Sequence, residues 1–144
     1  MICTMNKITT MTKHTFIIDD DPYLILIMQK FLAIVDFDHH PFSFESAITA
    51  LDHLKVQYNP TDTFTIFLDL NMPVMNGWAF LDELALFASP ANTYVFVITS
   101  SISPSEKTRA TQNPFVIDFD SKPISEDMVS AFKALVDAQL NTDN

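Results

Sequence analysis

The chain alternates short apolar runs with longer amphipathic segments, and this alternation restricts its fold more than any other feature. Five runs have the β-branched and aromatic character of strands, and the second is the weakest: residues 14–18, 36–44, 63–70, 94–101 and 115–119. A segment with apolar residues at helical spacing or a helix-start signal follows each run. Strands that alternate with helices are joined by right-handed crossovers, which build a parallel sheet covered on both faces. We therefore expect an α/β fold with a doubly wound, five-stranded parallel sheet and five helices.

Cap residues indicate where several of these helices begin. Asp21 before Pro22 is typical of an N-cap followed by the first helical position. Residues 103–106 have the pattern of a capping box that contains a proline, and Ser125 precedes the last amphipathic segment. The helix that starts after residue 103 has Ala110 as almost its only apolar residue. We expect that helix to be weakly held.

The length and the termini suggest one domain in a reducing compartment. At 144 residues the chain is long enough for one hydrophobic core. We expect residues 1–12 to be a flexible N-terminal segment, residues 13–141 to be the folded domain, and no output domain to follow. The start lacks the apolar stretch of a signal peptide, no segment reads as a membrane span, and Cys3 is the single cysteine. These features predict a cytoplasmic protein with no membrane association.

Charge and glycine content exclude two classes of function. The formal net charge is −10, which would repel a phosphate backbone, so we expect no nucleic-acid partner. Gly77 is the only glycine of the chain, so neither a glycine-rich phosphate loop nor a dinucleotide-binding fingerprint can form. Any phosphate chemistry must therefore use other groups.

Polar residues stand where the predicted strands end. Asp19 and Asp20 end the first strand, Asp69 ends the third, Thr99 ends the fourth, and Lys122 follows the fifth. In an open parallel sheet the carboxyl ends of the strands lie at one edge, which borders the functional crevice. The fold should therefore bring these scattered side chains together.

The chemistry of this set fits phosphoryl transfer. Carboxylates that repel one another bind a hard divalent cation, and Mg²⁺ typically takes one or two of them while keeping water ligands. The Lys122 ammonium can neutralise an oxyanion, and the Thr99 hydroxyl can donate a hydrogen bond to the same group. Because phosphoryl transfer depends mainly on positioning and charge stabilisation, a carboxylate with such neighbours can serve as the nucleophile.

Four motifs in this order resemble the receiver domain of two-component response regulators, which has a flavodoxin-like fold: IIDDDP, FLDLNMPVMNGW, VITSS and SKP. The resemblance extends from about Lys13 to Leu140. It implies that Asp69 accepts a phosphoryl group from a sensor histidine kinase or a histidine phosphotransfer protein, in a phosphorelay that requires Mg²⁺. It also implies that the peptide bond before Pro123 is cis.

The resemblance also assigns roles to the other site residues. Asp20 would be the more direct Mg²⁺ ligand and Asp19 would act largely through water, while Asn71 would supply its backbone carbonyl to the metal ion. Thr99 and Lys122 would contact the phosphoryl oxygens.

Two features of the sequence depart from the pattern of the family. The switch aromatic on the fifth strand, which moves together with the hydroxyl residue Thr99, is Phe119 and has no hydroxyl. Asn113 and Pro114 replace the glycine-alanine pair that often precedes that strand.

We interpret the chain as a stand-alone receiver that is no enzyme beyond its own phosphorylation and self-dephosphorylation. Its signal would leave through an unknown protein target bound to the last two helices and the fifth strand, and we expect a monomer or weak dimer. One alternative is a Mg²⁺-dependent phosphatase of the haloacid-dehalogenase type, with Asp19 and Asp21 as its catalytic pair. The other is a degenerate receiver that acts only as a scaffold.

Overall fold

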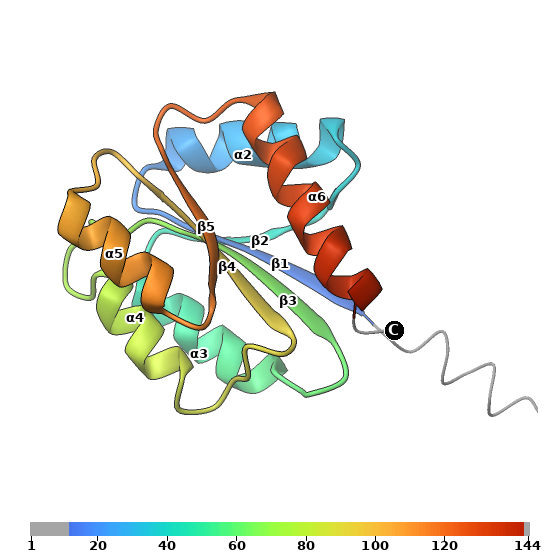
Figure 1. Ribbon diagram of the computed structural model, residues 1–144, viewed down its shortest axis with the longest axis horizontal. Coiled ribbons are helices and arrows are strands. Elements are labelled where there is room, and N and C mark those ends of the chain that lie inside the picture. The colour runs from blue at the N-terminus through green and yellow to red at the C-terminus, as the bar shows by residue number, and fades with distance from the viewer. Residues whose placement is uncertain (1–11, 143–144) are drawn as a thin grey trace, which may run out of the picture.

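The computed structural model describes residues 12–142, and within them the chain forms one parallel sheet with five helices (Figure 1). The expected flexible segment, residues 1–12, lies outside this range except for Thr12, so that expectation stays a prediction. The strands are β1 (Lys13–Ile18), β2 (Phe42–Phe44), β3 (Thr63–Leu68), β4 (Thr93–Thr99) and β5 (Val116–Ser121). The helices are α2 (Pro22–Ile34), α3 (Ala47–Gln57), α4 (Gly77–Leu84), α5 (Pro104–Gln112) and α6 (Glu126–Thr142).

All neighbouring strands are parallel, in the order β2-β1-β3-β4-β5. The doubly wound, flavodoxin-like fold expected from the sequence is confirmed. The strand order reverses direction between β1 and β3, which places the crevice of such a sheet at the carboxyl ends of these two strands. No helix in residues 12–142 combines the length and the apolar character that crossing a bilayer requires.

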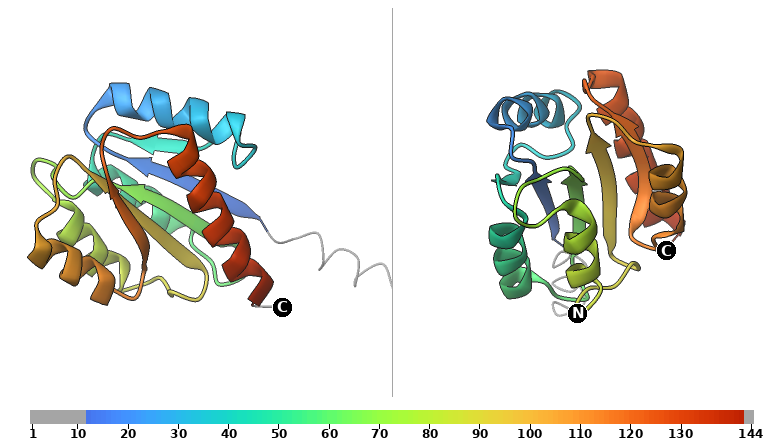
Figure 2. Two further views of the ribbon diagram at one scale, coloured as in Figure 1. Left: turned by 45° about the horizontal axis from the view of Figure 1, so that its top comes forward. Right: turned by 90° about the vertical axis from the view of Figure 1, so that its left-hand side faces the viewer.

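Helices cover both faces of the sheet, and the strand residues alternate between two cores. Helices α2 and α6 lie over one face, while α3, α4 and α5 lie on the other, as the views in Figures 1 and 2 show. In β1, Phe16 and Ile18 pack toward the α3/α4 side, whereas Ile17 packs toward α2 and α6. The period of two along a strand therefore supplies apolar side chains to both layers.

The second strand is shorter than the sequence pattern predicts. Residues 36–41 form the turn after α2, where Asp36 takes a positive φ of 57°. The Asp36 N–H donates to Ala33 O, and the Phe37 N–H donates to Leu32 O, so both close the end of the helix. These backbone groups are therefore not available for pairing with β1.

The predicted helix caps are present. The Asp21 carboxylate accepts a hydrogen bond from the Tyr23 N–H at the start of α2. Ser103 and Glu106 form the reciprocal capping box of α5, and the Ser125 hydroxyl accepts from the Met128 N–H at the start of α6. The end of α5 is closed by Asn113, whose side chain accepts from the Phe115 N–H in place of the glycine turn.

A bulge in β5 sets the register beside β4. Val95 pairs with Val116 but Phe96 pairs with Asp118, so Ile117 is an extra residue in β5. One extra residue reverses which face the following side chains take. As a result Phe119 packs toward the α3/α4 side although Ile117 packs toward α2 and α6.

Candidate functional site

The predicted polar residues meet at the carboxyl edge of the sheet. Asp19 and Asp69 directly follow β1 and β3, Thr99 is the last residue of β4, and Lys122 directly follows β5. Asp19 and Asp69 are only 2% and 4% exposed, and Thr99 is fully buried, whereas Asp20 is exposed. The site is therefore a largely buried pair of carboxylates with one further carboxylate at its rim.

Lys122 joins the two buried carboxylates. Its Nζ lies 2.9 Å from Asp19 Oδ2 and 3.4 Å from Asp69 Oδ2. Burial alone would lower the pKa of the Lys122 ammonium, but its hydrogen bond to Asp19 and the charges of Asp19 and Asp69 outweigh burial and raise this pKa above its ordinary value. Lys122 is therefore a fixed positive charge at the rim of the site.

Asp19 is buried at a cost that its partners do not fully offset. Desolvation is the largest influence and raises the pKa of its carboxyl, and the nearby negative charge of Asp69 acts in the same direction. The hydrogen bond from the Asp21 N–H to Asp19 Oδ1, 2.8 Å long, and the contact with Lys122 act in the opposite direction. The net rise in the pKa of Asp19 therefore reflects mainly its burial, and the charge of Asp69 adds to it.

The donor atoms of the site suit a hard divalent cation. Carboxylate oxygens of Asp19, Asp20 and Asp69 all lie within 4.8 Å of one another. Oxygen ligands in this number, with one carboxylate exposed to solvent, are what Mg²⁺ takes when it keeps part of its water shell. The residues present therefore fit the cation that the sequence predicts.

Gly77 fixes the helix that follows the Asp69 loop, which we define as residues 69–76. The Gly77 N–H donates to Leu70 O at 2.9 Å. A Cβ at Gly77 would lie 2.7 Å from Asp69 O and 2.8 Å from Leu70 Cα, closer than side chains are tolerated. The single glycine of the chain therefore stands where α4 packs against the backbone of Asp69.

Asn71 contributes a contact that the sequence did not indicate. Its side-chain Nδ2 donates to Thr99 Oγ1 at 3.0 Å, and its backbone N–H donates to Asp69 Oδ1 at 3.2 Å. The predicted metal ligand, the backbone carbonyl of Asn71, lies in the same loop. The sequence shows only that a polar residue stands two positions after Asp69. Its side-chain partner on β4 is known only from the structure.

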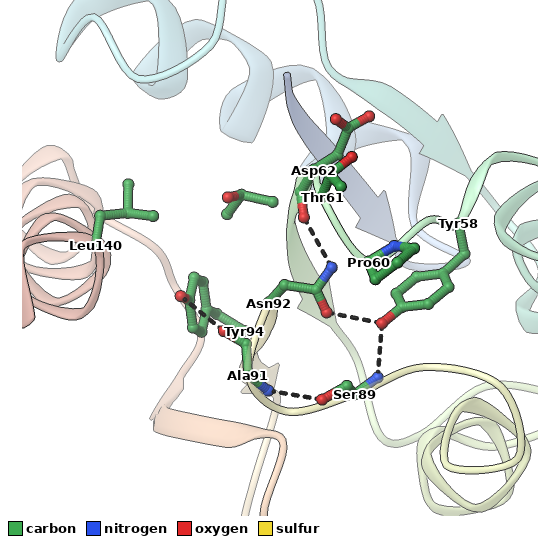
Figure 3. A pocket seen from close by; sticks show the side chains of 10 residues that line it. Tyr58, Pro60, Thr61, Asp62, Ser89, Ala91, Asn92, Tyr94 and Leu140 are labelled. Carbon is green, nitrogen blue, oxygen red and sulfur yellow. Dashed lines mark hydrogen bonds between the residues drawn. The ribbon is translucent and has the colours of Figure 1, made fainter. Parts of the chain in front are cut away.

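A hollow of about 200 Å³ borders the site between α2 and the loop that precedes α6. Its lining is mainly apolar and includes Tyr23, Ile27 and Ile124, with Lys122 at its edge. A larger cavity of about 250 Å³ lies at the opposite, amino-terminal edge of the sheet and is shown in Figure 3. There Tyr58, Asn92 and Ser89 bond to one another and brace the loops. Chemistry and topology therefore place the candidate site at the carboxyl edge of the sheet, beside the smaller hollow.

Comparisons with known proteins identify the family. The family model described as the response regulator receiver domain matches residues 15–132. The chain belongs to this family. No curated protein matches the chain.

Solved structures of other receivers share the fold of this receiver domain. A response regulator receiver protein from Dyadobacter fermentans is 25% identical with a TM-score of 0.77, over 90% of this chain and 98% of that one. A two-component response regulator from Cytophaga hutchinsonii is 22% identical with a TM-score of 0.74, over 91% of this chain and 98% of that one. One from Legionella pneumophila is 24% identical with a TM-score of 0.70, over 88% of this chain and 99% of that one.

The receiver domain also has the cis peptide bond that the resemblance implied, between Lys122 and Pro123. Phe119 is half-buried and packs against the core on the α3/α4 side, so the departure from a tyrosine leaves an apolar ring at this position.

Proposed function

We propose that this receiver accepts a phosphoryl group on Asp69. The observation that carries the proposal is the position of the Asp69 carboxylate: it is almost fully buried, 3.4 Å from Lys122 Nζ, and in one acidic cluster with Asp19 and Asp20. In this arrangement the carboxylate supplies the nucleophilic oxygen. The lysine ammonium beside it supplies the positive charge that stabilises the incoming phosphoryl oxygens.

The transfer requires one bond to form and one to break. An Asp69 oxygen attacks the phosphorus of a phosphohistidine, the P–N bond breaks, and the imidazole nitrogen leaves with the electron pair. The product is an acyl phosphate on Asp69. Lys122 would neutralise a phosphoryl oxygen, and the Thr99 hydroxyl, which accepts a hydrogen bond from Asn71 Nδ2, would donate its own proton to another.

Asp19, Asp20, Asp69 and the backbone carbonyl of Asn71 would hold Mg²⁺. When bound, the ion supplies positive charge for the phosphoryl oxygens and relieves the repulsion among the carboxylates. We also propose self-dephosphorylation, in which a water oxygen attacks the phosphorus, the bond between the phosphorus and the Asp69 oxygen breaks, and inorganic phosphate leaves the regenerated Asp69 carboxylate.

The proposed phosphodonor is a histidine kinase or phosphotransfer protein in the cytoplasm. The apolar hollow beside Lys122 supports contact with a donor there, because Lys122 lines it and also contacts Asp69, and because the hollow is open to solvent. The proposed downstream target would bind the surface formed by α5, β5 and α6. We propose that the protein acts as a monomer or weak dimer and that residues 13–141 form one receiver domain.

A phosphatase of the haloacid-dehalogenase type is less well supported. That reading needs Asp21 as a catalytic carboxylate, but Asp21 caps helix α2 through the Tyr23 N–H and does not belong to the acidic cluster. Membership of the receiver family also favours Asp69 as the reacting residue. A degenerate receiver that acts only as a scaffold would accept no phosphoryl group.

Intact-protein mass spectrometry tests the proposal. The wild-type chain is incubated with acetyl phosphate or phosphoramidate, with and without Mg²⁺, beside Asp69→Asn. We expect one added phosphoryl group that requires Mg²⁺ and is lost in Asp69→Asn. An adduct that survives in Asp69→Asn but is lost in Asp19→Asn would favour the phosphatase. No adduct together with no binding of beryllofluoride, a phosphoryl mimic, would favour the scaffold.

A further inference from the structure

The cavity at the amino-terminal edge of the sheet takes no part in the proposed phosphoryl chemistry. Its volume is about 250 Å³, and it lies between the loops that precede β3 and β4 and the carboxyl end of α6, which contributes Leu140 (Figure 3). An apolar cavity of about 150 Å³ inside a protein holds a molecule of the size of benzene. The cavity at this edge therefore has room for one long side chain.

Several polar groups in the wall of this cavity are already hydrogen-bonded within the domain. The Tyr58 hydroxyl donates to Asn92 Oδ1 and accepts from the Ser89 N–H. Asn92 Nδ2 donates to the carbonyls of Asn59 and Asp62. The described residues that line the cavity include no lysine, arginine or histidine, and the lining is mainly apolar. An apolar occupant therefore fits this cavity better than an anion or a strongly polar molecule.

The first described residue of the chain is held at the rim of the cavity. The Thr12 N–H donates to Asp62 Oδ1 at 3.2 Å, and the Thr63 N–H donates to Thr12 O at 2.9 Å. The Asp62 carboxylate also bonds to Asn59 Nδ2 and His14 Nε2, so it is engaged within the domain. Asp62 and Thr63 both line the cavity. The chain before Thr12 therefore starts directly beside it.

Both ends of the chain leave the described domain beside this cavity, but only one of them has apolar side chains. Leu140 lines the cavity and α6 ends at Thr142, after which the chain has only Asp143 and Asn144. Residues 1–11 instead include several apolar side chains: Met1, Ile2, Met5, Ile8 and Met11. Met11 is the one next to Thr12, so it is the nearest candidate for the cavity.

The register of β1 beside β3 also favours Met11. Lys13 pairs with Thr63, so the same register continued by two positions would set Met11 opposite Thr61, which lines the cavity. Side chains alternate between the two faces of a sheet, and Ile17 packs on the side of α2 and α6. The same alternation would point Met11 to that side, where α6 borders the cavity. A methionine side chain is unbranched and fills irregular gaps well.

We propose that the Met11 side chain occupies this cavity and fastens the start of the chain to the loops before β3 and β4 and to the carboxyl end of α6. Its apolar contacts would come mainly from Pro60, Tyr94 and Leu140. The docking is independent of the proposed function, because none of these residues belongs to the acidic site. It limits the flexible segment predicted from the sequence, residues 1–12, to residues 1–10.

Oxidation of the methionines by hydrogen peroxide tests the docking in the unmodified chain. We expect Met11 to be oxidised roughly three- to tenfold more slowly than Met5, because burial protects the thioether and the entropy of ordering it offsets part of that effect. In urea, where the chain unfolds, the two rates should be equal. Peptide mass spectrometry measures both rates. Equal rates in the folded chain overturn the docking and leave the cavity to an occupant from outside the chain.

Two leucines of α6 show whether the cavity is what protects Met11. Leu140→Ala removes part of the cavity wall, and we expect it to bring the oxidation rate of Met11 close to that of Met5. The matched control is Leu135→Ala, on the exposed side of the same helix, which should leave the protection of Met11 unchanged. Equal effects of the two substitutions, or full protection of Met11 in Leu140→Ala, overturn the cavity as the docking site.

Urea denaturation provides a readout that does not depend on oxidation. Met11→Ala should increase the equilibrium constant of unfolding roughly three- to tenfold, whereas Met5→Ala should leave it unchanged. In Leu140→Ala the effect of Met11→Ala should shrink, because the contact is already weakened. An effect of Met11→Ala that is absent, or that keeps its full size in Leu140→Ala, overturns the contact.

Dilution distinguishes docking within one chain from docking into a second copy. If Met11 occupies the cavity of its own chain, its protection from peroxide should not depend on protein concentration. Protection that disappears on dilution would mean that Met11 occupies the cavity of another copy, and it would overturn docking within the chain.

Discussion

At the scale of single residues, Val74 has the least favourable backbone conformation in the Asp69 loop. Its φ is 67° although its side chain is β-branched, and that side chain is 95% exposed, so packing does not compensate. Glycine adopts this conformation freely but loses more chain entropy on folding. We expect Val74→Gly to increase the free energy of unfolding by about 0.5–1 kcal/mol, measured by urea denaturation.

Val56 provides a matched control for this substitution. It is also a valine, 88% exposed, but it lies in helix α3. Replacing a valine by glycine in a helix costs roughly 0.3–0.5 kcal/mol, because no strained φ is relieved. If Val74→Gly destabilised the protein as much as Val56→Gly, the positive φ would not be a source of strain.

Asp20 is the acidic residue whose charge can be removed with the least structural change, because it is exposed at the rim of the cluster. Without a cation, Asp20→Asn relieves repulsion from Asp19 and Asp69, and we expect a gain on the order of 1 kcal/mol in the free energy of unfolding. With Mg²⁺ in excess the order should reverse, because only the wild type binds the ion tightly enough to be stabilised. Thermal unfolding with and without Mg²⁺ measures both effects.

A substitution at the neighbouring Asp21 distinguishes the loss of a metal ligand at Asp20 from a change in the net charge of the turn. Asp21→Asn removes the same charge one residue away and keeps a good N-cap for α2. It should retain the stabilisation by Mg²⁺. Equal loss of that stabilisation in both variants would mean that the cation responds to the net charge of the turn and not to the ligands.

At the scale of elements, the start of α4 depends on the absence of a side chain at Gly77. Helix propensity favours alanine by about 1 kcal/mol, but a Cβ here would lie 2.7 Å from Asp69 O. Because the obstructing atoms are backbone, α4 must move away from the Asp69 loop. We expect Gly77→Ala to lower the free energy of unfolding by roughly 1–3 kcal/mol, the usual range for overpacking, and to slow phosphorylation of Asp69.

Ala79→Gly is the control for Gly77→Ala, because it changes propensity in the same helix without adding an atom. It should destabilise the chain by about 1 kcal/mol and leave the phosphorylation rate unaffected. A stable Gly77→Ala with normal phosphorylation would contradict the tight contact. Urea denaturation and mass spectrometry of the phosphorylated chain measure the two quantities.

The elements whose signals are local were predictable from the sequence. The starts of α2, α5 and α6 follow from cap residues that bond within three positions, and the central strands β3 and β4 follow from continuous apolar runs. The short β2 and the bulge at Ile117 were not predictable. Both depend on which residue of a neighbouring strand is paired, and pairing has no local sequence signal.

At the scale of the whole molecule, topology made the site predictable. Parallel strands bring Asp19, Asp69, Thr99 and Lys122 to one edge of the sheet, whatever the directions of their side chains. Knowing where each strand ends in the sequence was therefore enough to predict that these residues lie together. The Asn71–Thr99 bond and the cation–π stack of Arg109 on the Trp78 ring could not be found that way. Each depends on the direction of two side chains from different elements, which is set only when the layers pack.

At the opposite, amino-terminal edge of the sheet, Asp62 connects several segments of the chain. It lines the cavity in Figure 3. Its carboxylate accepts hydrogen bonds from the Thr12 N–H and Asn59 Nδ2 and pairs with His14 Nε2 at 2.9 Å, while its carbonyl accepts from Asn92 Nδ2. Asn59 and then His14 lower the pKa of the Asp62 carboxyl below its ordinary 3.8. Residues from the start of β1 and from the loop before β3 therefore meet at one ionised group, and the loop before β4 bonds to the backbone of the same residue.

The lowered pKa of the Asp62 carboxyl determines how its contribution to the free energy of unfolding depends on pH. A carboxyl whose pKa is lower in the folded state stabilises the fold fully above 3.8 and loses that contribution as the pH falls through the folded-state pKa. We expect Asp62→Asn to be less stable than the wild type at pH 6, by an amount on the order of 1 kcal/mol. The difference should shrink steadily below pH 3.8, in urea denaturation at a series of pH values. In the control Asp52→Asn, on the exposed surface of α3, the difference from the wild type should not shrink as the pH falls. A difference for Asp62→Asn that stays constant with pH would mean that the contacts of Asp62 stabilise this edge through their geometry and not through its charge.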